Sequence, residues 1–138
     1  MLVVDASFIA AAFAEETHTE SARDVLEQHR DRLLAAPALI RWELASVFWK
    51  KLRRGEIGES VLADLAVFID ELRLDHPSVP DGPEIGATIL IARGSALSAY
   101  DAAYLALALE RAAPLATVDR NLTRAAVAAG LIVYSPFA

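Results

Sequence analysis

Short apolar segments alternate along the chain with longer segments whose apolar residues recur at every third or fourth position. The short segments have the length and composition of buried strands and span residues 2–4, 32–37, 115–118 and 131–134. The longer segments predict helices at residues 6–13, 17–30, 38–55, 59–73, 84–93, 99–112 and 120–129. Wholly apolar strands between helices are typical of a parallel sheet covered on both faces. The pattern therefore predicts an α/β fold with three layers, α/β/α, around a central parallel sheet.

Turn-forming residues separate these segments without marking a domain boundary. Residues 75–83 form a predicted loop with a brief strand at Ser78 and Val79, and Gly130 is expected to end the last helix. The chain holds no internal repeat, low-complexity run or linker rich in Ser and Gly. Its 138 residues suffice to bury one core, so we expect a single domain over residues 1–138.

Composition narrows the kind of protein. The absence of Cys excludes disulfides, thiolate metal sites and a thiol nucleophile, and it is consistent with a reducing compartment. The apolar N-terminus lacks a preceding basic region and contains Asp5, unlike a secretory signal. No apolar run has the roughly 18 residues that a membrane span needs. We therefore expect a cytoplasmic protein with no membrane association.

Charge and hydrophobicity add two constraints. A net charge of −6 argues against binding nucleic acid through general positive charge, so any such contact must depend on a local basic patch or on metal ions. Hydrophobic residues make up 55% of the chain, which is high for a soluble domain. This share suggests that another copy or a partner covers part of the surface.

Four acidic residues fall at one edge of the predicted sheet. Asp5 and Asp119 each directly follow a predicted strand, so both lie at its carboxyl end. Asp101 begins a helix that leads back into a strand, which places it at the same edge. Glu43 lies about five residues into its helix, still in the half near this edge, on an otherwise apolar stripe. Open parallel sheets bind their ligands at this edge, where the strand order reverses.

This arrangement of carboxylates indicates a particular chemistry. Clustered carboxylates repel one another and raise one another's pKa values unless a cation is present. A site of oxygen ligands alone favours Mg²⁺ or Mn²⁺, and such an ion can activate a water for phosphodiester hydrolysis. The three histidines lie in polar segments away from this edge, and we assign no acid–base role to His18, His29 or His76.

Asp101 has a second interpretation. Ser98 and Asp101 match a capping box, in which the two side chains bind backbone N–H groups at a helix start. Ser98 can cap the helix while Asp101 faces the other acids, so the two interpretations are compatible.

At this point the residues resemble a known family. The segments VVDASFIAAAF, SAYDAAYLALA and LATVDRNLTRAA, together with the helical Glu43, resemble the PIN-domain ribonucleases, most closely the VapC-type toxins of bacterial and archaeal toxin–antitoxin pairs. The resemblance covers nearly the whole chain and depends on the ordered set of motifs. One departure is Pro114, which stands where family members often have Gly before the strand that follows.

The resemblance implies a PIN-like fold and a set of functional residues. It makes Asp5, Glu43, Asp101 and Asp119 the acidic quartet that binds Mg²⁺ or Mn²⁺ and positions the attacking water. Ser7 and Thr117 would hold these carboxylates in place, and Asn121 could extend the metal shell through its amide oxygen. Ordinary capping of a helix or strand end remains open for all three of these residues.

The resemblance also implies partners. RNA would be the substrate, and a cognate VapB-type antitoxin would hold the enzyme inactive by covering the acidic pocket with its tail. A homodimer is expected as well. The function predicted in this way is a Mg²⁺- or Mn²⁺-dependent endoribonuclease that serves as the toxin of a type II toxin–antitoxin system.

One helix carries the basic and aromatic residues that bear on partners. The strongest basic cluster comprises Lys50, Lys51, Arg53 and Arg54, with Arg41 earlier on the same helix. It serves either to contact RNA phosphates or simply to complement the helix dipole. Trp42, Phe48 and Trp49 cover more than one face of this helix, so the core cannot easily hold all three. Core burial is still favoured, with an antitoxin groove or dimer interface as the alternative for the tryptophans. Tyr100 and Tyr104 are expected to pack rather than to face a nucleobase.

Three other functions compete with the toxin. A PIN-domain nuclease that processes RNA and a catalytically inert PIN-like binding module both remain open. A phosphoacceptor receiver domain has a similar sheet and a Mg²⁺ site at the same edge, but it requires a Lys after the last strand. Both lysines of this chain lie at positions 50 and 51, which disfavours a receiver.

Overall fold

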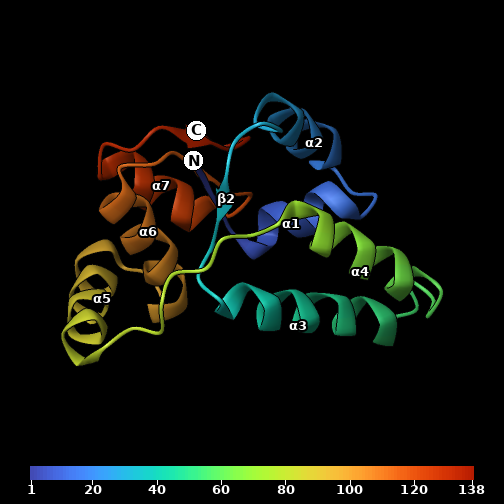
Figure 1. Ribbon diagram of the computed structural model, residues 1–138, viewed down its shortest axis with the longest axis horizontal. Coiled ribbons are helices and arrows are strands. Elements are labelled where there is room, and N and C mark those ends of the chain that lie inside the picture. Colours follow the sequence, from blue (N-terminus) through green and yellow to red (C-terminus); the bar gives the residue numbers. More distant parts are fainter.

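The computed structural model describes all residues, 1–138, and centres on one parallel sheet of four strands (Figure 1). The strands are β1 (Leu2–Val4), β2 (Leu34–Ala35), β3 (Leu115–Ala116) and β4 (Val133–Tyr134). Their order across the sheet is β2-β1-β3-β4. The chain moves outward from β1 to β2 and later returns on the other side of β1, so the strand order reverses between β1 and β3. Ligand sites of open parallel sheets lie beyond the carboxyl ends of such strands.

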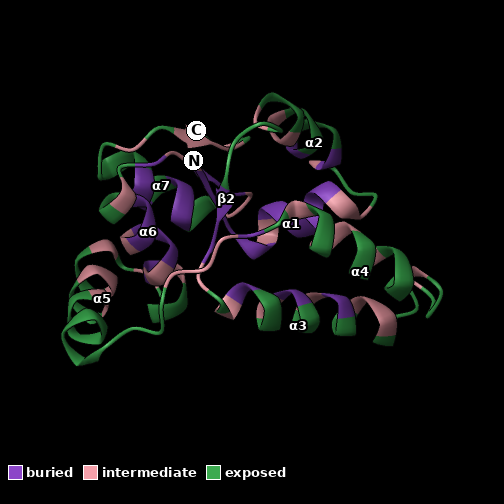
Figure 2. Ribbon diagram, in the orientation of Figure 1, coloured by how far each residue is buried: buried purple, intermediate pink, exposed green.

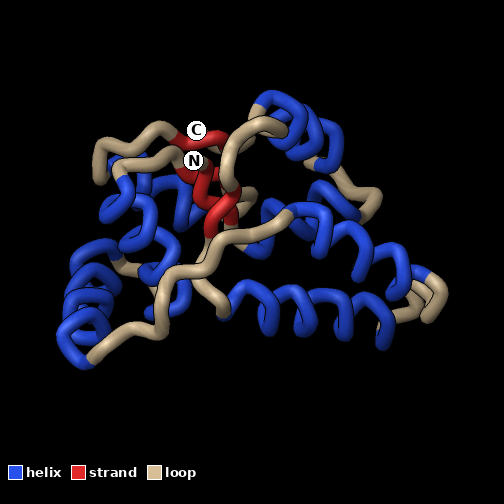
Figure 3. Tube along the Cα trace, viewed as in Figure 1, coloured by secondary structure: helices blue, strands red, loops and turns tan.

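Seven helices surround the sheet. They are α1 (Ala6–Phe13), α2 (Thr19–Gln28), α3 (Leu39–Arg53), α4 (Val61–Leu72), α5 (Gly82–Ser95), α6 (Ala99–Arg111) and α7 (Arg120–Ala128). The strands run between two groups of helices, with α1 to α4 on one side and α5 to α7 on the other (Figure 3). The predicted α/β fold with a central parallel sheet is confirmed. No helix combines the length and apolar character needed to cross a lipid bilayer.

The core follows the sheet and the helices closest to it. Every residue of β1, β2 and β3 is buried, as are most residues of α1 and the inner face of α6 (Figure 2). By contrast, α4 and α5 contain no buried residue. The elements that flank the reversal point are therefore the most firmly packed part of the molecule, because burial of apolar surface is the main stabilising term in folding.

The predicted strand at Ser78 and Val79 is wrong. Val79 is 90% exposed, and the neighbouring segment instead forms a single parallel bridge between Ala35 and Asp75. The physical reason lies in the flanking residues Pro77 and Pro80, which have no N–H to donate to a sheet. The confirmed strands are also shorter than their apolar segments, at two or three residues each.

Core burial was also wrong for the two tryptophans of α3. Phe48 is buried, but Trp42 is 81% exposed and Trp49 is 57% exposed. The inward face of α3 is formed by Ile40, Leu44 and Phe48, which lie four residues apart. Because Trp42 is two residues from Ile40, the helical period turns it to the opposite side.

Candidate active site

Asp5 directly follows β1, and Asp119 lies three residues after the end of β3, so both stand at the carboxyl ends of the two adjacent strands between which the strand order reverses. Each also caps the helix that begins next to it. Asp5 Oδ1 accepts a hydrogen bond of 2.9 Å from the backbone N–H of Phe8, and Asp119 Oδ1 accepts one of 2.7 Å from that of Leu122. The sequence thus fixes both carboxylates locally, because a side-chain oxygen at the N-cap satisfies an otherwise unpaired N–H of the helix.

Two hydroxyl groups connect the Asp5 carboxylate to the backbone of the segment that follows β3. Thr117 Oγ1 donates to Asp5 Oδ2 at 2.6 Å and accepts from the backbone N–H of Asp119 at 3.0 Å. Ser7 Oγ donates to Asp5 at 2.8 Å and accepts from the backbone N–H of Val118 at 3.0 Å. Thr117 therefore caps locally and also contacts a carboxylate, so the two interpretations of this residue hold together.

Asp101 stands at the first turn of α6, where Ser98 is the N-cap. Ser98 Oγ accepts from the backbone N–H of Asp101 at 3.1 Å, but no bond returns from the Asp101 carboxylate to the backbone N–H of Ser98. Only half of the capping box is formed. Apart from the Ser98 hydroxyl, whose hydrogen bond lowers the pKa of Asp101, no group of the protein bonds the Asp101 carboxylate, so this carboxylate is available to a ligand.

Glu43 reaches the site from α3 and is held by a tyrosine on α6. The Tyr104 hydroxyl donates to Glu43 Oε1 at 2.5 Å, and the Tyr104 side chain is almost fully buried. Burial and the neighbouring Glu43 raise the pKa of Tyr104, so its hydroxyl keeps its proton and remains a donor.

Sequence reasoning gave Tyr104 a packing role only and missed this contact. The available signal was its spacing, because Tyr104 lies three residues after Asp101 and so shares a helix face with it. Tyr100 behaves differently: it is 67% exposed, so its expected packing is wrong.

All four acids line one open pocket with a volume of about 290 Å³. Asp5, Glu43, Asp101 and Asp119 enter it from four different elements of the chain. Ser7, Tyr104 and Lys50 are also part of its wall. Asn121 is exposed and does not line this pocket, and none of the histidines does.

The electrostatics of the pocket reflect the crowding of these acids. Burial raises the pKa of Asp5 to about 6, with a smaller contribution from the charge of Asp119, and it does so although three hydrogen bonds oppose the shift. Burial also raises the pKa of Glu43, to which the charge of Asp101 adds. The pKa of Asp101 is raised by burial and then by Asp119. The carboxylates therefore repel one another, and a bound cation would relieve this repulsion.

The donor set suits a hard divalent cation. The pocket offers carboxylate oxygens and no imidazole or thiolate, the chemistry preferred by Mg²⁺ and Mn²⁺. No three Asp, Glu or His side chains already stand as a closed metal-ligand group. Mg²⁺ does not require one, because it usually keeps several waters and binds through one or two carboxylates. Asp101 and Asp119 are the best placed to supply them, because their carboxylates make fewer hydrogen bonds to the protein than that of Asp5.

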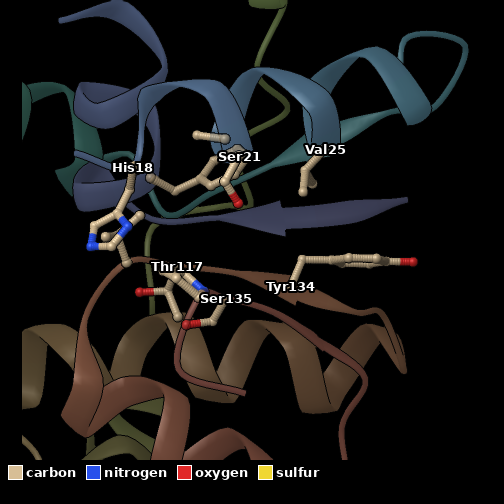
Figure 4. A pocket seen from close by; sticks show the side chains of 10 residues that line it. His18, Ser21, Val25, Thr117, Tyr134 and Ser135 are labelled. Atoms are coloured by element: carbon tan, nitrogen blue, oxygen red, sulfur yellow. The ribbon is translucent and has the colours of Figure 1, made fainter. Parts of the chain in front are cut away.

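A second cavity lies between α2 and the strands β3 and β4 (Figure 4). His18, Ser21, Thr117 and Ser135 are among the residues that line it. Its volume is about 10 Å³, which is room for about one water molecule. None of the four acids lines it, so it is not a substrate site.

A parallel sheet with an acidic pocket at the point where the strand order reverses is also found in a known protein family. The sequence model of the PIN domain matches residues 2–128, and the chain belongs to the PIN-domain family. The family inferred from the motif segments is thereby confirmed. Ribonuclease VapC3 of Pyrobaculum aerophilum is 33% identical over 125 residues, which are 88% of this chain and 91% of that protein.

Two solved structures share the fold. The protein PAE2754 from Pyrobaculum aerophilum has a TM-score of 0.69 at 24% identity, covering 96% of this chain and 90% of its own. The VapC20 toxin from Mycobacterium tuberculosis, which cleaves the sarcin–ricin loop, has a TM-score of 0.65 at 18% identity, covering 96% and 97%. At these identities the two structures support the fold and nothing further.

The raised pKa of Asp5 predicts a pH-dependent stability of the metal-free protein. The folded state binds a proton at Asp5 up to about pH 6, whereas in the unfolded chain the carboxyl group has its ordinary pKa of 3.8 and releases the proton there. Stability therefore falls as pH rises through this window, by about 3 kcal/mol for a shift of this size. Asp5→Asn cannot titrate, so its stability relative to the unmodified protein should rise by most of this amount between roughly pH 4 and pH 7.5.

Urea unfolding in the presence of a chelator, at a series of pH values, measures this difference. The comparison with Asp5→Asn removes the contribution of all other titrating groups, because both proteins share them. A difference that stays constant across the series contradicts the raised pKa.

Proposed function

We propose that this chain is an endoribonuclease that depends on Mg²⁺ or Mn²⁺ and serves as the toxin of a VapBC-type toxin–antitoxin system. The observation that carries the proposal is the meeting of four carboxyl groups in one pocket at the reversal point of a PIN-family sheet. The reaction type is supported by VapC3, which is named as a ribonuclease and is similar to this chain over nearly its whole length.

The residues of the pocket have different roles in the proposed reaction. A divalent cation bound there supplies Lewis acidity toward a phosphodiester and lowers the pKa of water. Asp5 is immobilised by Ser7, Thr117 and a backbone N–H, so it gives the pocket a fixed charge. Asp101 and Asp119 are less engaged by the protein, so their carboxylates can approach a ligand. Glu43, oriented by Tyr104, completes the negative wall against which a water and the scissile phosphate are positioned.

The role as a toxin accounts for features outside the pocket. Ribonuclease VapC3 shares the VapC name with the VapC20 toxin. Trp42 and Trp49 expose large aromatic surfaces on the helix that also carries Glu43, and exposed aromatic side chains are common anchors of protein interfaces. We propose that a VapB-type antitoxin docks on this helix and closes the pocket with its tail.

Removal of any one of the four acids should abolish RNA cleavage. Asp5→Asn, Glu43→Gln, Asp101→Asn and Asp119→Asn each delete one charge with little change of shape. Because loss of an outer-shell partner of a metal ligand already lowers activity by about 10-fold to 100-fold, each variant should lose at least about 100-fold. The measurement is cleavage of total RNA with Mg²⁺ or Mn²⁺.

Two controls accompany this assay. Glu110→Gln removes an exposed charge from α6 outside the acid pocket and should cleave normally. A chelator should stop RNA cleavage by the unmodified protein. Mn²⁺ should raise the melting temperature of the unmodified protein but not that of the Asp101→Asn variant. Folded acid variants that cleave like the unmodified protein contradict the proposal.

Tyr104→Phe should lower cleavage by about 10-fold to 100-fold while the packing of α6 is preserved. The change removes only the hydroxyl that orients Glu43. The free energy of unfolding should therefore fall by only about 1 kcal/mol. The concentration of Mn²⁺ needed for half-maximal activity should rise, a readout that a purely structural role would not move. Tyr100→Phe, on the same helix but exposed, is the matched control and should behave like the unmodified protein.

Expression of the chain in bacteria tests the toxin assignment separately from the chemistry. Induction should arrest growth, because cleavage of cellular RNA stops protein synthesis, and Asp119→Asn should permit normal growth. Continued growth with an active enzyme present would instead indicate a PIN-domain nuclease of another kind. Counts of viable cells after induction give the result.

A further inference from the structure

Most residues of the basic cluster at the end of α3 already contact an acidic or aromatic side chain. Lys51 Nζ lies 3.8 Å from a Glu16 oxygen and 3.6 Å from a Glu56 oxygen. Arg54 lies 4.0 Å from Glu56, and the guanidinium of Arg53 lies 5.9 Å from the centre of the Trp49 ring. These three cations already have partners, so they are poor candidates for contacting a substrate.

Lys50 differs from its neighbours in two respects. It is exposed and has no carboxylate within the 4.0 Å of an ion pair, and it lines the acid pocket together with Glu43 and Val47. Positions 43, 47 and 50 follow one stripe of the helix, so Lys50 stands about 10 Å along α3 from Glu43. It is the single cationic side chain in the pocket wall.

Other cations near this edge of the sheet are also engaged. Arg120 follows Asp119, but its guanidinium lies 4.0 Å over the ring of Phe137. The Nε of Arg41 donates to His76 Nε2 at 2.9 Å. Lys50 thus has its ammonium donors available at a pocket that is otherwise negative.

We propose that Lys50 binds a backbone phosphate of the RNA strand and thereby sets the position of the strand against the four acids. This inference rests on the proposed ribonuclease function. A protein with a net charge of −6 attracts RNA poorly at long range, so a local cation beside the cleavage pocket has a large share in holding the strand. A contact to phosphate positions the substrate without reading its sequence.

The test compares Lys50→Ala and Lys50→Arg with Lys51→Ala, which removes the same charge from the adjacent position. The probe is a fluorescently labelled, single-stranded oligoribonucleotide of mixed sequence. Its affinity is measured by fluorescence anisotropy over a series of salt concentrations, with all proteins carrying Asp101→Asn to prevent cleavage. The kcat and KM values for the same probe are measured with the Asp101 carboxylate intact.

Loss of one phosphate contact to a single strand should lower the slope of log affinity against log salt by about 0.7 and weaken binding by about five-fold near 0.1 M salt. Lys50→Ala should therefore raise KM by about this factor and leave kcat nearly unchanged. Lys50→Arg keeps the charge and should restore binding, whereas Lys51→Ala should resemble the unmodified protein in both slope and KM.

Three results overturn the proposal, and the first is that Lys50→Ala has no effect on affinity or KM. Equal effects of Lys50→Ala and Lys51→Ala would mean that only general charge matters, and a loss of kcat at constant KM would place Lys50 in the chemical step. The proposed nuclease function fails separately. If the unmodified protein binds the probe through Lys50 but cleaves no RNA, the phosphate contact stands and the nuclease does not. If the unmodified protein cleaves RNA and Lys50→Ala is without effect, the nuclease function stands and the phosphate contact of Lys50 does not.

Discussion

The buried carboxylate of Asp5 joins the two central strands and defines the pocket around it. Asp5 follows β1, and its oxygens accept from Ser7, from Thr117 next to β3 and from the first turn of α1. A buried carboxylate without such donors would be strongly unfavourable. With them, it is held as a fixed point at the place where the strand order reverses. Asp119 is tied to the same network through Thr117, so the geometry of the two acids is coupled.

The protein keeps an unfavourable charge distribution at this one place. Burial and mutual repulsion raise the pKa of Asp5, Glu43 and Asp101, which means that their ionised forms are strained in the metal-free state. The surrounding structure tolerates this strain because α1 and α6 are among the best-buried helices. Perturbed carboxyl groups in an open pocket are typical of functional sites, where stability is given up for chemistry.

The helix α3 divides its surface among three tasks. Ile40, Leu44 and Phe48 face the core, whereas Glu43 and Lys50 line the pocket. The tryptophans remain on the outside. The proposed substrate and the proposed antitoxin would therefore meet the same helix on adjacent faces. A protein bound over the tryptophans would lie beside the pocket, which offers a physical basis for inhibition of the enzyme by a docked partner.

The sequence by itself determined the alternation of strands and helices, the parallel sheet and the edge at which the acids gather. These features follow from local patterns, because a residue directly after a strand of a parallel sheet must lie at its carboxyl end. Tertiary structure alone decided which contacts are made there. Tyr104 meets Glu43 across 61 positions of the chain, and Lys50 rather than Lys51 faces the pocket. Such choices depend on how helices pack and turn against one another, and that packing is set by the whole core rather than by neighbours in the chain.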